Sequence, residues 1–403
     1  MRFNLWEDCN RVPLTELLSF VVDNRGKTVP TAPSGHKLIA TNCVTNNALF
    51  PVYEKIRYLS EETYQTWFRA HPIPGDILFV NKGTPGRVCL VPDPVDFCIA
   101  QDMIALRADE SKIYPKYLFA VLRSREIQQQ IYNTNVGDVI PHFKKQFLDQ
   151  LLIPIPERSI QESIGDLYYV LSLKAERNKK INDNLEQQAQ AIYHERFETV
   201  SPNDLPSDWR IVTLGEVATI SNKSFNPLKE PEILLEHYSI PAFDEARFPV
   251  FELSTSIKSN KFIIDASCFM ISKLNPTTKR VWKPYCLTGN AVCSTEFIVY
   301  KAKDKTITDF LYSAIDSNSF SDFMCSHVTG STGSRQRATP SDTLSYELIL
   351  PSGDELAEFQ SLVSPMYAQI RINAIENDRL KRLRDSLLPK LMSGEIDVFT
   401  IQL

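Results

Sequence analysis

Glycine is scarce in this chain of 403 residues, at 13 residues, and the glycine-rich loops that hold nucleotide phosphates are missing. There is no G-x-x-x-x-G-K-[ST] segment, and no G-x-G-x-x-G segment follows a strand-like run. The nearest match, NKGTPGR from Asn81 to Arg87, is typical of a hairpin turn. These absences argue against a nucleotide-binding enzyme.

The sequence also lacks metal-site spacings and long apolar runs. The six histidines show no ligand spacing, and the eight cysteines include no C-x-x-C pair, so we expect free, mostly buried thiols in a reducing cytosol. No run approaches the roughly 18 apolar residues of a membrane span, and the start, MRFNLWEDCN, has no apolar signal stretch. We therefore expect a cytoplasmic protein with no membrane contact.

Catalytic motifs are missing as well. The segment LNPTT, Leu274 to Thr278, begins like the Asn-Pro-Pro-Tyr motif of methyltransferases but lacks its second proline and its aromatic residue. Isolated carboxylates such as Asp76, Asp102 and Glu296 have no histidine or second acid at a useful spacing, which predicts turn or hydrogen-bonding roles. We expect that the chain is not an enzyme.

What is present is an ordinary globular composition, with 43% hydrophobic and 23% charged residues and a net charge of −5. Because single cores stop growing at roughly 250–300 residues, the length predicts two or three domains. A nucleic-acid site on such an acidic chain would have to be a local basic patch.

The chain contains an internal repeat. VPLTELLSF from Val12 matches VTLGEVATI from Val212 at an offset of 200, and LLIPIP at 151–156 resembles LILPS at 348–352. Both of the latter runs are strand-like and lead into long helical segments. The sequence therefore predicts two related halves.

The middles of the halves have diverged. PGDILFVNK from Pro74 aligns best with ASCFMISK from Ala266, about 191 positions on, and little else matches. Divergence could reflect an old duplication with relaxed loops, or selection of each middle to recognise a different target.

Each half ends in a heptad pattern, from near Ser159 to Phe197 and from near Gly353 to Leu391. We call its apolar positions, spaced by 3 and 4 residues, the seam. Pro365 predicts a kink or a late start in the second helix. The seam of each helix contains two asparagines, 195 positions apart between the helices: Asn178, Asn182, Asn373 and Asn377.

A seam asparagine weakens apolar contact but satisfies its amide in only one register. Two per helix would pair across a pseudo-two-fold axis if the helices run antiparallel. The alternative is that these side chains face solvent on separate amphipathic helices.

The predicted fold is mixed α/β (α+β), with two globular domains separated by a long antiparallel two-helix coiled coil and related by a pseudo-two-fold internal repeat. The expected boundaries are 1–157 for the first recognition domain, 158–200 for the first spacer helix, 201–352 for the second recognition domain, and 353–403 for the second spacer helix and C-terminal tail. Helices of this length span about 55 Å at 1.5 Å per residue.

Basic and polar residues cluster in loops of both middles. Arginine and lysine pair with phosphates and with base edges in a major groove, although any single one could be merely solvated. The candidate DNA contacts are Arg25, Lys27, Lys82, Arg87 and Lys144 in the first domain, and Lys273, Lys279, Arg280, Lys283, Arg335 and Arg337 in the second. Replacing Arg280 with alanine is expected to alter only the second half of a recognised site.

Taken in order, several segments resemble the specificity subunit of type I restriction-modification systems, over nearly the whole sequence. The second strand-to-helix passage, LILPSGDELAEFQ, departs from the family's usual IPIPERSIQ form, which is present in the first half, by losing one proline and lengthening the turn. The segments are DNRGKTVP (23–30), GDILFVNKGTPG (75–86), LPSDWRIVTLGEV (205–217), ISKLNP (271–276) with RVW (280–282), STEFIVY (294–300), and GST (330–332) before LILP (348–351).

The resemblance implies a non-catalytic subunit whose two target-recognition domains each read one half of a split, asymmetric double-stranded DNA site. The helices would fix the gap, at most about 16 base pairs for ~55 Å. Two methylation subunits would dock, and restriction/translocase subunits would join. Adenine-N6 methylation, nuclease activity, S-adenosylmethionine, ATP and magnesium would then belong to the partners, with no cofactor in this chain.

Two other readings stay open at this level. A protein-binding coiled-coil scaffold with no DNA role explains the helices but not the basic loops at matching places in both halves. A related system that methylates adenine without restriction would use the same kind of subunit.

Overall fold

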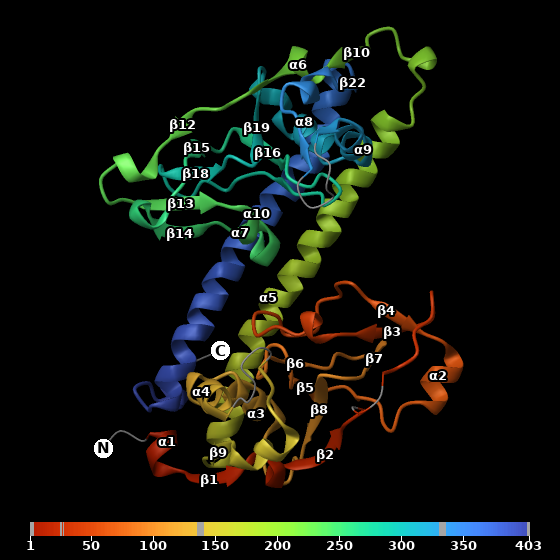
Figure 1. Cartoon of the computed structure of the whole chain (residues 1–403). Coiled ribbons are helices and arrows are strands. Elements are labelled where there is room, and N and C mark those ends of the chain that lie inside the picture. The colour runs from red at the N-terminus through yellow and green to blue at the C-terminus, as the bar shows by residue number, and fades with distance from the viewer. Residues whose placement is uncertain (1–3, 25, 27, 135–140, 330–335, 401–403) are drawn as a thin grey trace. The chain divides into compact units, whose positions relative to one another are not determined.

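The computed structural model describes residues 4–24, 26, 28–134, 141–329 and 336–400. Internal contacts divide the chain into a first unit, Met1–Arg177 with Arg379–Leu403, and a second unit, Asn178–Asp378. The division passes through both long helices, α5 (Arg158–Tyr193) and α10 (Gly353–Met392), so each unit contains part of each helix (Figure 1). The domain boundaries expected from the sequence stay a prediction.

The first unit combines a four-stranded antiparallel sheet, in the order β2-β8-β5-β6, with a three-stranded sheet, β4-β3-β7, and a two-stranded sheet, β1-β9. Its strands are β1 (Asn10–Pro13), β2 (Leu18–Val22), β3 (His36–Ile39), β4 (Arg57–Leu59), β5 (Ile77–Val80), β6 (Val88–Leu90), β7 (Phe97–Ile99), β8 (Met103–Ala108) and β9 (Leu152–Ile155). Its shorter helices are α1 (Leu5–Asp8), α2 (Glu61–Thr66), α3 (Pro115–Leu122) and α4 (Arg125–Thr134).

The second unit repeats this plan with β11-β19-β16-β17, β10-β22 and a larger sheet, β12-β15-β18-β13-β14. A two-stranded pair, β20-β21, also belongs to the second unit. Its strands are β10 (Arg210–Thr213), β11 (Ala218–Ile220), β12 (Ser224–Phe225), β13 (Leu234–Tyr238), β14 (Val250–Leu253), β15 (Lys261–Ile263), β16 (Cys268–Ser272), β17 (Val281–Trp282), β18 (Ala291–Ser294), β19 (Phe297–Ala302), β20 (Val328–Thr329), β21 (Arg337–Ala338) and β22 (Glu347–Leu350). Its shorter helices are α6 (Leu214–Val217), α7 (Ile240–Ala246), α8 (Thr308–Ile315) and α9 (Asn318–Ser326).

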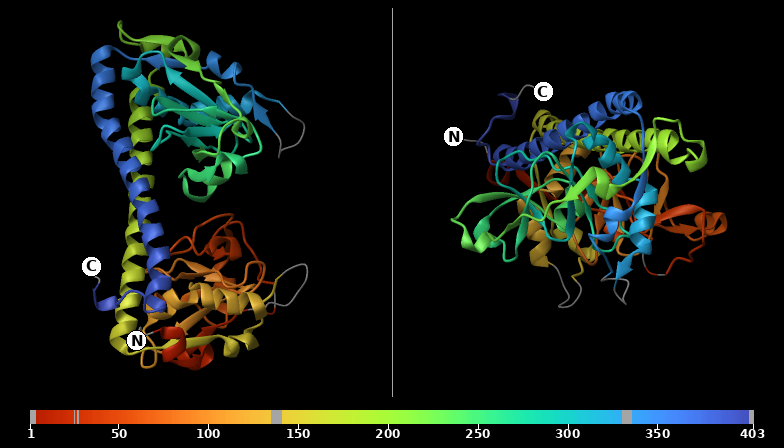
Figure 2. Two further views of the ribbon diagram at one scale, coloured as in Figure 1. Left: turned by 90° about the vertical axis from the view of Figure 1, so that its left-hand side faces the viewer. Right: turned by 90° about the horizontal axis from the view of Figure 1, so that it is seen from above.

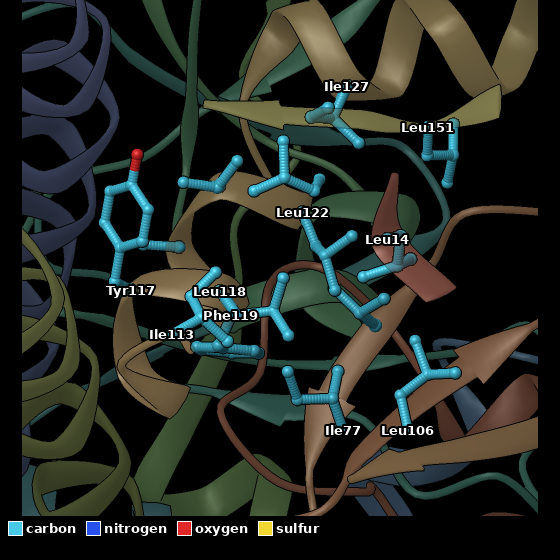
Figure 3. Packing of buried hydrophobic residues seen from close by; sticks show 14 of the residues in the cluster. Leu14, Ile77, Leu106, Ile113, Tyr117, Leu118, Phe119, Leu122, Ile127 and Leu151 are labelled. Atoms are coloured by element: carbon cyan, nitrogen blue, oxygen red, sulfur yellow. The ribbon is translucent and has the colours of Figure 1, made fainter. Parts of the chain in front are cut away.

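Strand β5 shows why the central strands read as continuous apolar runs. All four of its residues are buried, because alternate side chains enter two different cores. Ile77 and Phe79 pack in the cluster that includes α3, whereas Leu78 and Val80 pack with β3 and β7 (Figure 3 shows the first cluster). Burying one such side chain contributes roughly 1.5–3 kcal/mol.

The internal repeat predicted from the sequence is present in the strand pairing. Val12 pairs with Ile153 in β1-β9, and Val212 pairs with Leu348 in β10-β22. The runs LLIPIP and LILPS form β9 and β22, as their apolar pattern predicted. The units differ where the second has the additional strands β12 and β15.

The two long helices occur close to their predicted positions. α5 begins at Arg158 and is followed by a π-helical turn, His194–Glu198, and α10 runs without a break from Gly353 to Met392. Pro365 therefore lies inside α10, so the predicted late start is wrong. Figure 2 shows the helices side by side within each unit.

In the first unit, α5 lies unusually close to α3, and Gly165 makes this possible. A Cβ atom at Gly165 would lie 2.6 Å from the backbone nitrogen of Tyr117 and 2.9 Å from the carbonyl carbon of Lys116. These neighbours are backbone atoms, so they cannot rotate away. Only glycine fits at this position of α5.

In the second unit, the four seam asparagines bond to each other. Asn178 Nδ2 donates to Asn377 Oδ1 over 3.0 Å, and Asn373 Nδ2 donates to Asn182 Oδ1 over 2.8 Å. The residue numbers rise along one helix as they fall along the other, so the helices are antiparallel. Asn178 and Asn373 are equivalent in the repeat, as are Asn182 and Asn377, each 195 positions apart. Exchanging equivalent residues turns one pair into the other, which is the pseudo-two-fold symmetry of the repeat.

All eight cysteines are free, and Cys43, Cys89, Cys98, Cys268 and Cys293 are buried, as expected. Among the helices that the structure describes, none is long and apolar enough to cross a membrane.

Candidate nucleic-acid interface

In the first unit, the predicted turn NKGTPGR is the hairpin loop between β5 and β6. This loop is joined to the segment at 141–144 by three hydrogen bonds. Gly83 N donates to Pro141 O over 3.0 Å, and Phe143 N donates to Asn81 O over 2.7 Å. The buried Asn81 returns a side-chain bond from Nδ2 to Phe143 O over 3.1 Å. Two loops distant in sequence therefore form one surface.

The second unit has the same arrangement at the loop between β16 and β17. Asn275 N donates to Gln336 O over 2.9 Å, and Ala338 N donates to Lys273 O over 3.0 Å. These bonds make Lys273 the counterpart of Asn81, at an offset of 192. The offset of about 191 that the sequence suggested for this segment agrees with this value to within one residue.

In each unit, the joined loops are also hydrogen-bonded to the residue that precedes a third strand, β8 in the first unit and β19 in the second. Asn81 N and Lys82 N donate to Asp102 O over 2.8 and 3.3 Å, and Lys273 N donates to Glu296 O over 2.9 Å. Asp102 and Glu296 therefore occupy equivalent positions. We use the term joined loops for 81–87 with 141–144 in the first unit, and for 273–280 with 336–338 in the second.

The candidate cations of the first unit are accessible. Lys82, Arg87 and Lys144 are all exposed. Lys82 Nζ lies 4.0 Å from Asp102 Oδ1, whereas Arg87 and Lys144 pair with no carboxylate among the residues that the structure describes. The joined loops bring Lys82 and Lys144 onto one surface, because His142 bridges to Lys82.

Most candidate cations of the second unit are held by carboxylates. Arg280 donates from Nε and Nη2 to Asp244 over 2.6 and 2.9 Å, and Arg337 donates from Nε and Nη2 to Glu296 over 3.0 and 3.2 Å. Lys283 pairs with Asp309. The charges that these cations could offer to phosphate are therefore largely balanced.

Lys279 is held in the same way, with Nζ 3.0 Å from Asp316 Oδ1. Burial raises the pKa of Asp316 to about 6, although Lys279 acts in the opposite direction. Lys273 is partly buried and has no ion pair within the described part of the chain. Arg25, Lys27 and Arg335 lie outside the described residues.

Sequence reasoning found the cations but missed most of the acids that hold them. The partners Asp244, Asp309 and Asp316 lie 36, 26 and 37 positions from Arg280, Lys283 and Lys279. No periodicity connects residues so far apart. Asp76 and Glu296 are hydrogen-bonding groups as expected, and Asp76 receives two bonds of 2.9 Å from Arg107.

Among the described residues, no group of three or more metal-ligating side chains is suited to a metal ion. A hollow of about 290 Å³ lies beside stacked His36 and Tyr64 in the first unit. A second, of about 470 Å³, lies beside Lys283 in the second unit. The joined loops line neither hollow.

Residues 21–187 match the family described as type I restriction modification DNA specificity domain. This part of the chain is therefore similar to the DNA specificity domain of type I restriction-modification systems. The type I restriction enzyme MjaIX specificity subunit of Methanocaldococcus jannaschii is 22% identical over 80% of this chain and 78% of its own length. The HindI specificity subunit of Haemophilus influenzae is 23% identical over 80% of this chain and 86% of its own length.

A solved structure shows the same fold. The S subunit of a type I restriction-modification system from M. genitalium aligns with a TM-score of 0.58 at 16% identity, covering 96% of both chains. The chain therefore has the mixed α/β fold, with two domains and connecting helices, that the sequence predicted.

Proposed function

We propose that this chain is a type I specificity subunit and that it reads a bipartite, asymmetric double-stranded DNA site, with one half-site contacted by the joined loops of each unit. The repeated construction supports this proposal. The same backbone bonds build both surfaces, yet equivalent positions hold different side chains, such as Asn81 and Lys273 or His142 and Arg337. Equivalent scaffolds with different side chains suit two half-sites of different sequence.

The structure divides the candidate contacts into two groups. The first group is Arg87, Lys144 and Lys273, which make no ion pair within the described residues, together with Lys82, whose Nζ is 4.0 Å from Asp102. The second group is Lys279, Arg280, Lys283 and Arg337, which are bound closely by acids. An available cation that neutralises a phosphate releases a counterion, which makes binding salt-dependent. We propose the first group as phosphate contacts. Arg25, Lys27 and Arg335 remain candidates from the sequence alone.

Catalysis and cofactors are assigned to partners in this proposal. Two methylation subunits would carry S-adenosylmethionine and the adenine-N6 methyltransferase activity, and restriction/translocase subunits would carry ATP, magnesium and the nuclease. A cytoplasmic location follows from the proposed DNA target and partners. The net charge of −5 then means that partner subunits contribute much of the attraction to DNA.

Methylation mapping tests the proposal directly. The chain is co-expressed with its methylation subunit, and methylated adenines are mapped across the host genome by single-molecule sequencing. A split motif with two defined halves and a fixed gap is expected. A stable complex that methylates no defined motif would contradict the proposal and favour the alternative, a protein-binding scaffold without a DNA role.

The helices give the proposal a second test. We propose that α5 and α10, at 36 and 40 residues, set the gap between the half-sites. Removing seven residues from each shortens it by about 10 Å, or roughly three base pairs, with little rotation because seven residues are nearly two turns. The mapped motif should keep both halves and lose about three base pairs of gap. An unchanged gap would refute the spacer role.

A further inference from the structure

Asp102 is an exposed acid beside the joined loops of the first unit. Its carbonyl oxygen accepts from the backbone nitrogens of Asn81 and Lys82, which fixes it next to the hairpin loop. Its side chain is 48% exposed, and its carboxylate accepts no hydrogen bond from the residues that the structure describes. Asp102 therefore presents two unbonded acceptor oxygens on the surface that carries Lys82 and Lys144.

The equivalent acid of the second unit is already engaged. Both carboxylate oxygens of Glu296 accept from Arg337, over 3.0 and 3.2 Å. Asp102 instead has Lys82 Nζ at 4.0 Å, which is beyond hydrogen-bonding distance, and both of these side chains are about half exposed. The acid is thus bonded within the protein in the second unit and open to a partner in the first.

The backbone around Asp102 supplies a second, independent observation. The φ angle is +60° at Asp102 and +22° at Gln101, so two consecutive residues lie in the left-handed region that residues other than glycine rarely adopt. Aspartate and asparagine tolerate this region better than other side chains, but it still costs energy. Strained residues of this kind cluster at functional sites, so the strain favours a functional role for Asp102.

The charge of a carboxylate limits what it can contact on DNA. It repels phosphate, and it accepts hydrogen bonds without donating any. In the major groove, the N4 amino group of cytosine has no acceptor beside it on the same base, whereas the N6 amino group of adenine lies next to the acceptor N7. Guanine and thymine offer only acceptors or a methyl group there. An ionised aspartate in the major groove therefore favours cytosine, and Lys82 at 4.0 Å reduces its repulsion from the DNA backbone.

We infer that Asp102 reads a cytosine in the half-site contacted by the first unit, by accepting a hydrogen bond from cytosine N4 in the major groove. This inference rests on the proposed function. Lys82 and Lys144 contact phosphates and so position the joined loops, whereas Asp102 discriminates between bases. Glu296 has no such role in the second unit, because Arg337 occupies its carboxylate. The two half-sites are therefore read by different groups.

The test uses the complex of the full chain with its methylation subunit. Wild type, Asp102→Ala and Asp102→Asn are compared by methylation mapping and by binding to duplexes substituted at each position of the first half-site. Asp208→Asn is the matched control. Asp208 is an exposed aspartate in the turn before β10, and its side chain makes no bond to any other residue that the structure describes.

The expected results separate base reading from a general effect of charge. Asp102→Ala should reduce discrimination at one C·G pair of the first half-site by roughly 5- to 150-fold and leave the second half-site unchanged. Asp102→Asn should move the preference at this pair from cytosine towards adenine, because an amide both donates to adenine N7 and accepts from N6. Asparagine also tolerates the left-handed φ of this position, so this variant should keep the fold. Asp208→Asn should leave the motif unchanged.

Three results would overturn the inference. These are a first half-site without any C·G pair, Asp102 variants that keep the wild-type motif, and Asp102 variants that bind all sequences more tightly by the same factor. The last result would mean that Asp102 only repels the DNA backbone. Wild-type complex that methylates no split motif would instead refute the proposed function itself. A gained preference for adenine cannot arise from misfolding, so Asp102→Asn decides the question if Asp102→Ala forms no complex.

Discussion

Replacing Asn178 with alanine tests whether the seam asparagines hold the two helices of the second unit together. The Asn178 side chain is 1% exposed, and its Nδ2 donates to Glu376 Oε2 over 2.6 Å and to Asn377 Oδ1 over 3.0 Å. A hydrogen bond to a charged group is worth about 1.5–3 kcal/mol, and a neutral one about 0.5–1.5 kcal/mol. The two bonds together therefore contribute roughly 2–4.5 kcal/mol.

Alanine recovers part of this loss, because it is the better helix former by up to about 0.7 kcal/mol. The expected decrease in the free energy of unfolding is thus roughly 1.5–4 kcal/mol. Urea unfolding of the full chain, followed by circular dichroism, measures this change. Combining Asn178→Ala with Asn377→Ala should cost less than the two single changes added together, because both remove the same bond.

Asn184→Ala is the matched control on the same helix. Asn184 is exposed, and its side chain only accepts a bond from Gln188 four residues on. This substitution should be neutral or slightly stabilising, because helix propensity is then the main effect. The reasoning fails if Asn178→Ala is as well tolerated as Asn184→Ala, since Asn178 would then have no more role than a surface residue.

Three further predictions concern other parts of the chain. Burial raises the pKa of Asp316 from 3.8 to about 6, so the unfolded chain loses this proton at lower pH than the folded chain. As pH rises from 4 to 7, the unfolding free energy of wild type should therefore fall by up to about 3 kcal/mol relative to that of Asp316→Asn. Parallel curves of unfolding free energy against pH for the two proteins would contradict this. Gly165→Ala should lower the unfolding free energy by about 1–3 kcal/mol, because the new Cβ would overlap the backbone of Tyr117. Gly353→Ala is the control and should not lower it, because there is open space around Gly353. Equal thermal stability of the two variants would refute the close contact. Arg87→Ala should weaken binding of the methylation complex to all DNA sequences alike and reduce the salt slope by about 0.9, and loss confined to one base position would make Arg87 a base reader instead.

The candidate interface was only partly predictable. The basic loops could be found because lysine and arginine cluster in recognisable turns such as NKGTPGR. Their division into available and acid-held cations could not, because the acids are contributed by other strands and helices. Arg280 illustrates this point: the sequence marks it as a DNA contact, whereas its bonds to Asp244 and its low exposure favour a structural role.

The long-range pairings show the same limit. The match of Pro74 with Ala266 was visible in the sequence, but only the backbone bonds of Lys273 to Ala338 and Glu296 establish which residues are equivalent. Loops tolerate insertions of one residue, so sequence offsets drift there. Hydrogen-bonded strands do not, because each residue occupies a fixed place in the ladder.

The sequence by itself determined the repeat, the two long helices and the places of the four asparagines on their seams, because these follow from periodicity along the chain. That the helices are antiparallel and the asparagines pair was a prediction until their hydrogen bonds were seen. An apolar seam of period 3.5 and two asparagines at the same offset leave few alternatives. The tertiary structure alone decided which charges are free, where α5 must carry a glycine, and which loops share a surface. Those properties depend on atoms that meet across folded distance, and no local pattern in the sequence records them.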